Sequence, residues 1–227
     1  MKVGKNFSSI KELKYGAKML SLPEEEVAIS VNQLVELSQV YNAAIKEIST
    51  KLEILDEEFK VKHDHNPIHH MESRLKRPYS IMEKLDRKGY DSDFSTAMEY
   101  IYDIAGVRVI CPYVKDIYHI SDLLLRQDDI TLIKEKDYIK SPKINGYRSL
   151  HLVVSVPVFL SEMTKHVPVE VQIRTIAMDF WASLEHKLKY KSDSNFKEEI
   201  ERELVECANQ VAEVDLKMQE IHEKIHK

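Results

Sequence analysis

Two short segments hold side chains that bind phosphates, bases and metal ions. The first is NGYRSLH at residues 145–151, and the second is VEVQIRT at residues 169–175. Both alternate apolar and polar residues, as a β-strand with one buried face does. Their polar positions carry tyrosine, histidine, arginine, glutamate and glutamine, where an ordinary solvated strand would carry serine, threonine or lysine. The pattern predicts a chemically active face on a β-sheet.

The second segment places its charged groups on one face. Glu170, Gln172 and Arg174 lie two residues apart, so their side chains point to the same side of a strand. A carboxylate beside an arginine in the middle of a sheet is costly unless it is paired or coordinates a metal ion. The segment therefore has two interpretations, a structural Glu–Arg pair or part of a metal-dependent site.

A second carboxylate, Asp103, precedes the predicted strand GVRVIC at residues 106–111, on which Arg108 lies. Asp103 and Glu170 belong to separate strands, and their oxygens can hold one Mg²⁺ while nucleotide phosphates fill the rest of its shell. The two carboxylates are therefore our candidate metal ligands.

The basic run SRLKRPYSIMEKLDRKG at residues 73–89 offers cations and a hydroxyl at regular spacing. Lys76, Ser80 and Lys84 are four residues apart and share one face of a helix. Pro78 suits the first turn of that helix. A triphosphate binds such a line of positive donors at a helix start. The other interpretation is a solvated basic helix face.

Tyr147 follows Gly146 in a predicted loop, where its ring can form a flat platform for a base. The more general interpretation is a tyrosine at the rim of the core. A histidine-rich cluster lies at the end of a predicted helix that offers no scaffold for further ligands, so we interpret it as unrelated to metal binding. That cluster comprises His63, Asp64, His65, His69 and His70, and we interpret His222 and His226 likewise as surface residues.

Long amphipathic helices are predicted at both ends of the chain, over residues 21–62 and 196–226. The first begins at Ser21-Leu22-Pro23, with a capping serine and a proline in the first turn. In the second, apolar residues recur every three or four positions, and a stripe this long usually meets a partner helix. That partner is either the N-terminal helix of the same chain or a helix of another copy.

The segments between these helices predict the fold class. Residues 106–111, 129–138, 148–159 and 166–175 read as strands, and residues 116–127 and 175–191 read as helices. The order predicts an α+β fold in which a mixed sheet of about five strands is flanked by helices. We expect one domain over residues 1–227, with its core at about 40–195.

Composition narrows the class of protein. The 33 basic and 38 acidic residues give a net charge of −5, which argues against a general nucleic-acid binder. We expect no DNA partner, and RNA has no support in the sequence. Cys111 and Cys207 are far apart, which suggests buried thiols in a reducing compartment. No segment has the length or apolarity of a signal peptide or a membrane span, so we expect a cytoplasmic protein without a membrane partner.

Five motifs, taken together and in order, resemble the synthetase domain of the RelA/SpoT-type alarmone synthetases, over roughly residues 40–195. They are the spaced set Arg74, Lys76, Ser80 and Lys84, then YDIAGVR (102–108), NGYRSLH (145–151), VEVQIRT (169–175) and AMDFWASLEHKLKYK (177–191). The chain looks like a small, single-domain member of that family. The resemblance implies a nucleotidyltransferase-like fold, terminal helices that build a homotetramer, and GTP diphosphokinase activity. In that reaction the pyrophosphoryl group of ATP passes to the 3′-hydroxyl of GDP or GTP, giving ppGpp or pppGpp and AMP.

The resemblance also implies roles for individual residues. Arg74 and Arg108 would stack on adenine, and Asp103 and Glu170 would be catalytic and ligate Mg²⁺, with Glu170 accepting or orienting the 3′-hydroxyl proton. The ATP phosphates would be held by Lys76, Ser80 and Lys84. Contacts to the guanine nucleotide would come from Tyr147, which would stack on the base, and from Asp179. The remaining candidates would either contact that nucleotide or hold the two carboxylates, and they are Arg148, His151, Gln172 and Arg174.

Two other functions fit parts of the pattern. A catalytically silent domain could bind guanine nucleotides or RNA and regulate a partner, although such a module need not retain both Asp103 and Glu170. A nucleotidyltransferase that moves nucleoside monophosphate groups would attack a different phosphate. It would release pyrophosphate in place of AMP, so the products distinguish the two reactions.

Overall fold

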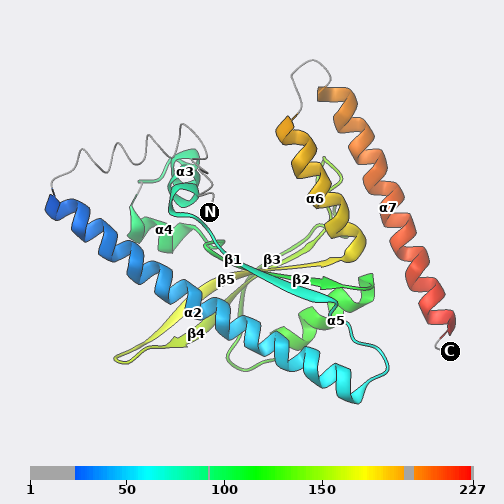
Figure 1. Cartoon of the computed structure of the whole chain (residues 1–227), viewed down its shortest axis with the longest axis horizontal. Coiled ribbons are helices and arrows are strands. Elements are labelled where there is room, and N and C mark those ends of the chain that lie inside the picture. The colour runs from blue at the N-terminus through cyan, green and yellow to red at the C-terminus, as the bar shows by residue number, and fades with distance from the viewer. Residues whose placement is uncertain (1–23, 92, 192–196, 226–227) are drawn as a thin grey trace, which may run out of the picture.

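One five-stranded sheet lies at the centre of the computed structural model, which describes residues 24–91, 93–191 and 197–225 (Figure 1). The strands are β1 (His70–Leu75), β2 (Ala105–Cys111), β3 (Thr131–Asp137), β4 (Leu150–Phe159) and β5 (Thr164–Thr175). Their order is β1-β2-β5-β4-β3, and β2 and β5 are parallel while the other neighbours are antiparallel. The mixed α+β architecture predicted from the sequence is confirmed.

The sheet has one apolar face and one polar face. On β5, the side chains of Val169, Val171 and Ile173 are fully buried, while Glu170 and Gln172 alternate with them and remain partly accessible. This is the alternation that the sequence predicts for a strand with one buried face. Because β5 lies between β2 and β4, its polar residues occupy the middle of the polar face.

Two helices bury the apolar face. Helix α2 (Glu24–Lys62) crosses the sheet diagonally and buries Tyr41, Ile48 and Leu52 in the main hydrophobic core (Figure 1). Helix α5 (Val114–Leu125) adds Ile117 and Ile120 to the same core. The long N-terminal helix is confirmed from Glu24 onward, and its predicted start at residues 21–23 lies outside the described residues.

The basic run folds differently from the prediction. Arg74 lies on β1, a strand that the sequence pattern did not predict, and helix α3 (Pro78–Lys88) begins only after Lys76. Pro78 occupies the first turn as predicted, and Gly89 ends the helix in the left-handed conformation, with φ of 75°. The strand was missed because the helical spacing of Lys76, Ser80 and Lys84 masked the short extended segment before it.

A further short helix was also missed. Helix α4 (Phe94–Tyr100) is capped by Asp93, whose Oδ1 accepts a hydrogen bond from the backbone N–H of Thr96 at 2.9 Å. The helix buries Ala97 and leads through Ile101 into Asp103. At seven residues it is too short to show a clear period in the sequence. It nevertheless fixes the approach of the chain to a candidate ligand.

The last two helices pack on one another. Helix α6 (Ile176–Lys191) follows β5 directly, and α7 (Lys197–Ile225) returns beside it (Figure 1). Trp181 of α6 and Leu204 and Ala208 of α7 form a second, smaller core. Within the chain, α7 therefore pairs with α6. The predicted alternative, pairing of α7 with the N-terminal helix, is wrong because the apolar stripe of α2 packs against the sheet.

The expectation that both cysteine thiols are buried is only half right. Cys111 is buried at the end of β2, but Cys207 lies on the exposed side of α7, so only one of the two thiols is buried. No helix in the described ranges is long and apolar enough to cross a membrane.

Candidate functional site

All five strands contribute side chains to two adjacent rows on the polar face. Strand register sets Arg74 of β1 opposite Gly106 of β2, and Gly106 opposite Glu170 of β5. On the other side, His151 of β4 lies opposite Gln172 of β5 and opposite Lys136 of β3. Directly paired residues share a face, so these side chains project together.

Asp103 forms one end of the site together with two lysines. Its Oδ2 accepts a hydrogen bond from Nζ of Lys76 at 2.9 Å. Nζ of Lys84 lies 2.8 Å from Oδ1, at ion-pair distance but without the angles of a directed hydrogen bond. Burial raises the pKa of Asp103, yet Lys84 and Lys76 outweigh it and hold the pKa below its ordinary value. Asp103 is therefore an ionised carboxylate that keeps two cations in place.

Ser80 stands one helical turn before Lys84 on α3 and is half-buried. Two of the predicted cations, Lys76 of the β1–α3 connection and Lys84 of α3, are thus brought together at Asp103. Because Asp103 already fixes both ammonium groups, they are held close to one another despite their like charge.

A narrow cavity lies between Arg74 and Arg108. Its lining includes both arginines, Gly106 between them, and Glu170. A Cβ added at Gly106 would lie 3.6 Å from Cγ of Arg74, so glycine at this point keeps the floor of the cavity low. Two guanidinium planes beside such a floor are suited to sandwich a planar base.

Glu170 begins a chain of hydrogen bonds that crosses to β4. Its Oε1 lies 3.2 Å from Nδ1 of His151, and Nε2 of that ring lies 2.8 Å from the hydroxyl of Tyr147. A carboxylate only accepts, so Nδ1 of His151 carries a proton and donates to Glu170, while Nε2 shares a hydrogen bond with the Tyr147 hydroxyl. Arg174 completes the chain by donating from NH2 to the Tyr147 oxygen at 2.6 Å.

Electrostatics keep Glu170 ionised. Burial raises the pKa of its carboxyl, but hydrogen bonding and charge from His151, with a second hydrogen bond from Gln172, outweigh burial and lower the pKa. The nearby Asp103 carboxylate acts in the opposite direction and raises the pKa of Glu170. The two candidate ligands therefore lie close enough to repel each other electrostatically, as two carboxylates that share a cation would.

The ring of Tyr147 is surrounded by cations and aromatic groups. The guanidinium carbon of Arg174 lies 5.0 Å from the ring centroid, and Nζ of Lys143 lies 4.5 Å from it. Burial raises the pKa of the Tyr147 hydroxyl, against the lowering effect of Arg174. The ring is thus held neutral and in a defined orientation, as a stacking platform requires.

A second basic group was not predicted from the sequence. Lys134 and Lys136 of β3 line one cavity with Lys143, Asp103 and Glu170, and its volume is about 230 Å³. The remaining lining residues are Lys84, Lys88, Tyr100, Tyr102, Tyr138, His151 and Val153. The signal was present in the alternation K-x-K at 134–136, which puts both lysines on one strand face. It became meaningful only when β3 was placed beside His151.

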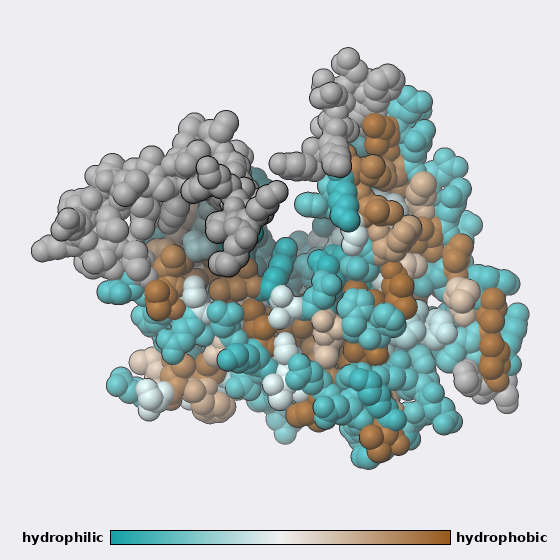
Figure 2. All heavy atoms as spheres, in the orientation of Figure 1, coloured by the Kyte–Doolittle hydropathy of each residue, from teal (hydrophilic) through white to brown (hydrophobic). Residues whose placement is uncertain are grey.

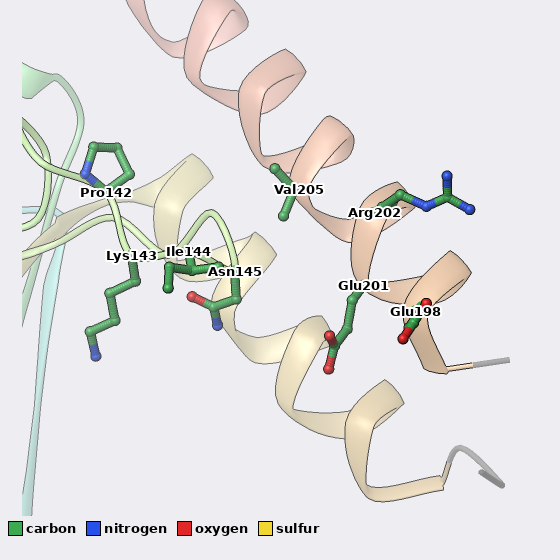
Figure 3. Close-up of a pocket in the computed structure, with 8 residues that line it drawn as sticks. All are labelled: Pro142, Lys143, Ile144, Asn145, Glu198, Glu201, Arg202 and Val205. Carbon is green, nitrogen blue, oxygen red and sulfur yellow. The ribbon is translucent and has the colours of Figure 1, made fainter. Parts of the chain in front are cut away.

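A larger hollow lies elsewhere. It measures about 1150 Å³ and lies between residues 142–145 and the start of α7 (Figure 3). Lys143 is the one residue that it shares with the charged cavity, and the side chain of Ile144 beside it is fully exposed. The carboxylates and lysines described above line the smaller, charged cavity, and the segment with Lys143 separates the two.

Arg148 does not join the predicted set of acceptor contacts. NH1 donates to the backbone carbonyls of Gly146 and Ala208, and NH2 donates to Oδ1 of Asn209. These bonds turn the side chain towards α7 and away from His151. Arg148 therefore anchors the loop that carries Tyr147. The same loop lies close against α7, because a Cβ added at Gly146 would come within 2.6 Å of Cβ of Ala208.

Asp179 and the histidine cluster also have defined partners. Asp179, in the first turn of α6, accepts a hydrogen bond from Arg174 at 3.1 Å. Nε2 of His65 lies 2.9 Å from Asp116, and its ring lies 4.8 Å from that of His222, so this histidine links three elements. Among the described residues, no group of three or more potential ligands is arranged to hold a metal ion. His226 lies outside those residues.

Sequence comparisons identify relatives of the chain. Residues 73–195 match the family model described as the region found in RelA / SpoT proteins. The chain is 45% identical over 186 residues to the GTP pyrophosphokinase YwaC of Bacillus subtilis strain 168, which covers 82% of this chain and 89% of that protein. It is 37% identical over 185 residues to the GTP pyrophosphokinase YjbM of the same strain, covering 82% of this chain and 86% of that protein.

Solved structures agree with the sequence matches. The small alarmone synthetase 1 of Bacillus subtilis, bound to its product pppGpp, superposes with a TM-score of 0.78 and 35% identity, covering 86% of this chain and all (100%) of that one. The small alarmone synthetase 2 of the same organism gives a TM-score of 0.73 and 44% identity, covering 82% of this chain and 96% of that one.

Proposed function

The chain belongs to the RelA/SpoT family, and on that premise we propose that it is an alarmone synthetase. It transfers the pyrophosphoryl group of ATP to the 3′-hydroxyl of GDP or GTP and releases AMP. The observation that carries this function is the continuous polar face. It joins the narrow slot between Arg74 and Arg108 and a lysine clamp at one end to an aromatic platform and a second lysine group at the other.

ATP occupies the β1–β2 side. Its adenine lies between Arg74 and Arg108, and its phosphates meet Lys76, Ser80 and Lys84. Phosphoryl-type transfer depends mainly on positioning and on charge stabilisation, because the phosphate oxygens carry the charge in the transition state. Two ammonium groups that Asp103 holds in place supply that stabilisation without reorganisation.

The guanine nucleotide occupies the β4–β3 side. Its base stacks on Tyr147, and its 5′-phosphates are neutralised by Lys134, Lys136 and Lys143, which line the cavity beyond the platform. This arrangement leaves the ribose over Glu170. Gln172, His151 and Arg174 act by fixing Glu170 and Tyr147, to which they are hydrogen-bonded.

Glu170 acts on the 3′-hydroxyl. Its carboxylate is ionised, so it accepts a hydrogen bond from the hydroxyl and takes its proton as the new O–P bond forms at the β-phosphorus. The bond between the β-phosphorus and the oxygen that bridges it to the α-phosphorus breaks, and AMP leaves with that oxygen. His151 holds the orientation of the carboxylate through the whole step.

The donor set of the cavity fits a hard divalent cation. Asp103 and Glu170 both line it, both are ionised, and carboxylate oxygens are the ligands that Mg²⁺ prefers. Two protein ligands leave room for phosphate oxygens and water in the remaining positions. When bound, Mg²⁺ would supply further neutralisation of the triphosphate charge.

We also propose that the chain acts as one catalytic domain assembled through its terminal helices. Residues Val214, Met218 and Ile225 of α7 are 60%, 52% and 72% exposed, and hydrophobic surface also runs along α6 (Figure 2). The homotetramer implied by the family resemblance would cover such surfaces. Light scattering of the intact protein and of Met218→Lys tests this, because a lysine in a buried stripe should dissociate the assembly.

Product analysis tests the activity. The purified protein is incubated with ATP, Mg²⁺ and either GDP or GTP, and the nucleotides are separated by anion-exchange chromatography. We expect AMP to appear together with ppGpp or pppGpp. Glu170→Gln should form neither, because it loses the charge that accepts the proton, while Glu162→Gln in the exposed β4–β5 turn should match the parent protein.

The other outcomes decide between the alternatives. Release of pyrophosphate with a nucleotidylated product would establish a nucleotidyltransferase. Binding of guanine nucleotide without turnover would favour a regulatory module that keeps the fold. Normal turnover by Glu170→Gln would reject the role of that carboxylate.

A further inference from the structure

One carboxylate oxygen stands between two arginines of the polar face. Oδ1 of Asp179 accepts the hydrogen bond from NH1 of Arg174 at 3.1 Å and lies 3.5 Å from NH1 of Arg108. Asp179 belongs to α6, whereas Arg174 is the last but one residue of β5 and Arg108 lies on β2. The contact therefore ties the start of a helix to two neighbouring strands.

Each arginine belongs to a different half of the site. Arg108 lines the slot assigned to adenine, together with Arg74. Arg174 donates to the hydroxyl of Tyr147 at 2.6 Å and lies over the ring of this acceptor platform. Asp179 is thus ion-paired with a side chain of the donor slot and hydrogen-bonded to the support of the acceptor platform at the same time.

The three groups interact strongly because they are shielded from solvent. The side chains of Arg174, Asp179 and Arg108 are 7%, 22% and 29% exposed. Nε of each arginine is buried and has no hydrogen-bond partner among the described residues, so the NH groups carry the contacts that orient both guanidinium groups. Without the charge of Asp179, two cations would face each other across a poorly solvated gap, and like charges at short range repel.

We propose that Asp179 is a positioning residue that couples the donor and acceptor pockets, an inference that rests on the proposed function. A base stacked on Arg108 orders that guanidinium against Asp179. Asp179 in turn fixes Arg174, and Arg174 fixes Tyr147. The second nucleotide then meets a platform that is already ordered, so less conformational entropy is lost when it binds.

This role differs from a direct contact of Asp179 with guanine. A direct contact would lower the affinity for guanine nucleotide whether or not ATP is present. Coupling lowers it only when the other pocket is occupied, and linkage requires the same factor in both directions. The two roles therefore separate in an equilibrium binding experiment that involves no turnover.

The experiment uses the intact protein, Mg²⁺, GDP and an ATP analogue with a methylene bridge between the α- and β-phosphorus atoms. Isothermal titration calorimetry gives the Kd of each nucleotide alone and in the presence of a saturating amount of the other. We expect each nucleotide to tighten the binding of the other by about 5- to 150-fold, the usual range of coupling between sites. In Asp179→Asn, each nucleotide alone should bind within about threefold of the parent, and the coupling factor should fall close to one.

Glu72→Gln is the matched control. Glu72 is 60% exposed and approaches NH1 of Arg108 at 3.3 Å from the opposite side of the slot. Like Asp179→Asn, the Glu72→Gln variant removes one negative charge beside Arg108, but Glu72 does not contact Arg174. The variant should therefore change the affinity for the ATP analogue and leave the coupling factor unchanged. If Asp179→Asn does not fold, Asp179→Ser keeps a short hydrogen-bond acceptor and replaces it.

Three results would overturn the inference. They are a coupling factor of one in the parent protein, an unchanged factor in Asp179→Asn, and loss of GDP binding by that variant in the absence of the analogue. The last would assign Asp179 to the base itself. Failure of the parent protein to bind either nucleotide would instead reject the proposed function, so the two failures are distinguishable.

Discussion

The two halves of the polar face, which we assign to the donor and to the acceptor nucleotide, are built in different ways. On the donor side, Lys76 and Lys84 approach a single carboxylate, Asp103, and Lys84 also lines the charged cavity. On the acceptor side, Tyr147 and Glu170 stand in a continuous series of hydrogen bonds through His151. The donor half is an electrostatic clamp, in which charge matters more than exact direction. The acceptor half is a preorganised network, in which direction matters as much as charge.

The difference predicts how each half responds to substitution. A clamp loses its function mainly when a charge is removed, because the field at the phosphates then weakens. A network loses its function when a single partner is removed, even if no charge changes, because the neighbouring groups lose their orientation. Neutral substitutions in the two halves should therefore have distinct kinetic signatures.

The largest effect is expected for Lys84→Met. Removal of a fixed cation at a developing negative charge typically costs about 10²- to 10³-fold in rate. We expect a loss of that size in kcat/KM for ATP and little change in KM for GDP, measured by steady-state kinetics with each nucleotide varied in turn. Arg87→Met is the control, because Arg87 lies in the last turn of the same helix α3, is exposed, and lines neither the slot nor the charged cavity. Equal losses in both variants would contradict a specific clamp at Lys84.

Substitution of Tyr147 tests the network. Tyr147→Ala should weaken binding of the acceptor nucleotide by about 1–3 kcal/mol, the range for loss of base–aromatic stacking. Tyr147→Phe keeps the ring and removes the oxygen that joins His151 to Arg174. It should bind GDP almost normally but turn over more slowly, because His151 then holds Glu170 less firmly.

Binding and turnover must therefore be measured separately for the two variants. If Tyr147→Phe turned over like the parent protein, the hydrogen-bond series would have no part in catalysis. An effect of Tyr147→Ala on ATP alone would move the ring to the other pocket and reverse the assignment of the two halves.

The two halves also differed in how far the sequence could predict them. Glu170, Gln172 and Arg174 alternate along one strand, so their shared face followed from the period of a strand. The five-strand α+β fold was predicted because its buried strands are strongly β-branched. Strand β1 and helix α4 were missed because each is too short for a periodic signal.

Contacts between distant segments could not be predicted. Arg148 lies beside Tyr147 in the sequence, but it turns towards Asn209, 61 positions later in the chain. Lys136 gained a role only once β3 was placed beside β4. Both results depend on how elements far apart in the sequence pack together, which local spacing does not encode.

The helices that support the two halves extend the comparison. On the acceptor side, the Thr175 hydroxyl precedes α6, accepts a hydrogen bond from the backbone N–H of Met178, and donates to Asp215 of α7. Burial raises the pKa of Asp215, although the hydrogen bond from Thr175 lowers it. A carboxyl group whose pKa is raised on folding destabilises the folded state when the pH is above that pKa, because the group is then ionised. The penalty disappears as the pH falls through that value.

Asp215→Asn should therefore stabilise the protein at pH 8. The amide oxygen can still accept from Thr175, while the buried charge is removed. A gain of about 1 kcal/mol would raise Tm by about 2–4 °C for a chain of this size. Calorimetric Tm values at several pH values test this, and the advantage over the parent should shrink as the pH falls. A lower Tm at pH 8 would show that the ionised form is the one that anchors α7.

On the donor side, Asp93 supports α4 with the opposite sign. Hydrogen bonds from Ser95 and Thr96 lower its pKa to about 2. The ionised carboxylate therefore stabilises the folded state at a pH above the ordinary pKa of an aspartate, and this stabilisation is lost as the pH falls towards about 2.

Asp93→Ala removes the cap and should cost about 1 kcal/mol of unfolding free energy at neutral pH. Asp93→Asn keeps a capping oxygen, so it should lose less at pH 7 and show a weaker dependence on pH between 4 and 2. Denaturant unfolding at pH 7 and at pH 3 measures both effects. If Asp93→Asn destabilised as much as Asp93→Ala at pH 7, the charge of the carboxylate would matter more than its geometry, and the donor half would be an electrostatic arrangement down to the helix that supports it.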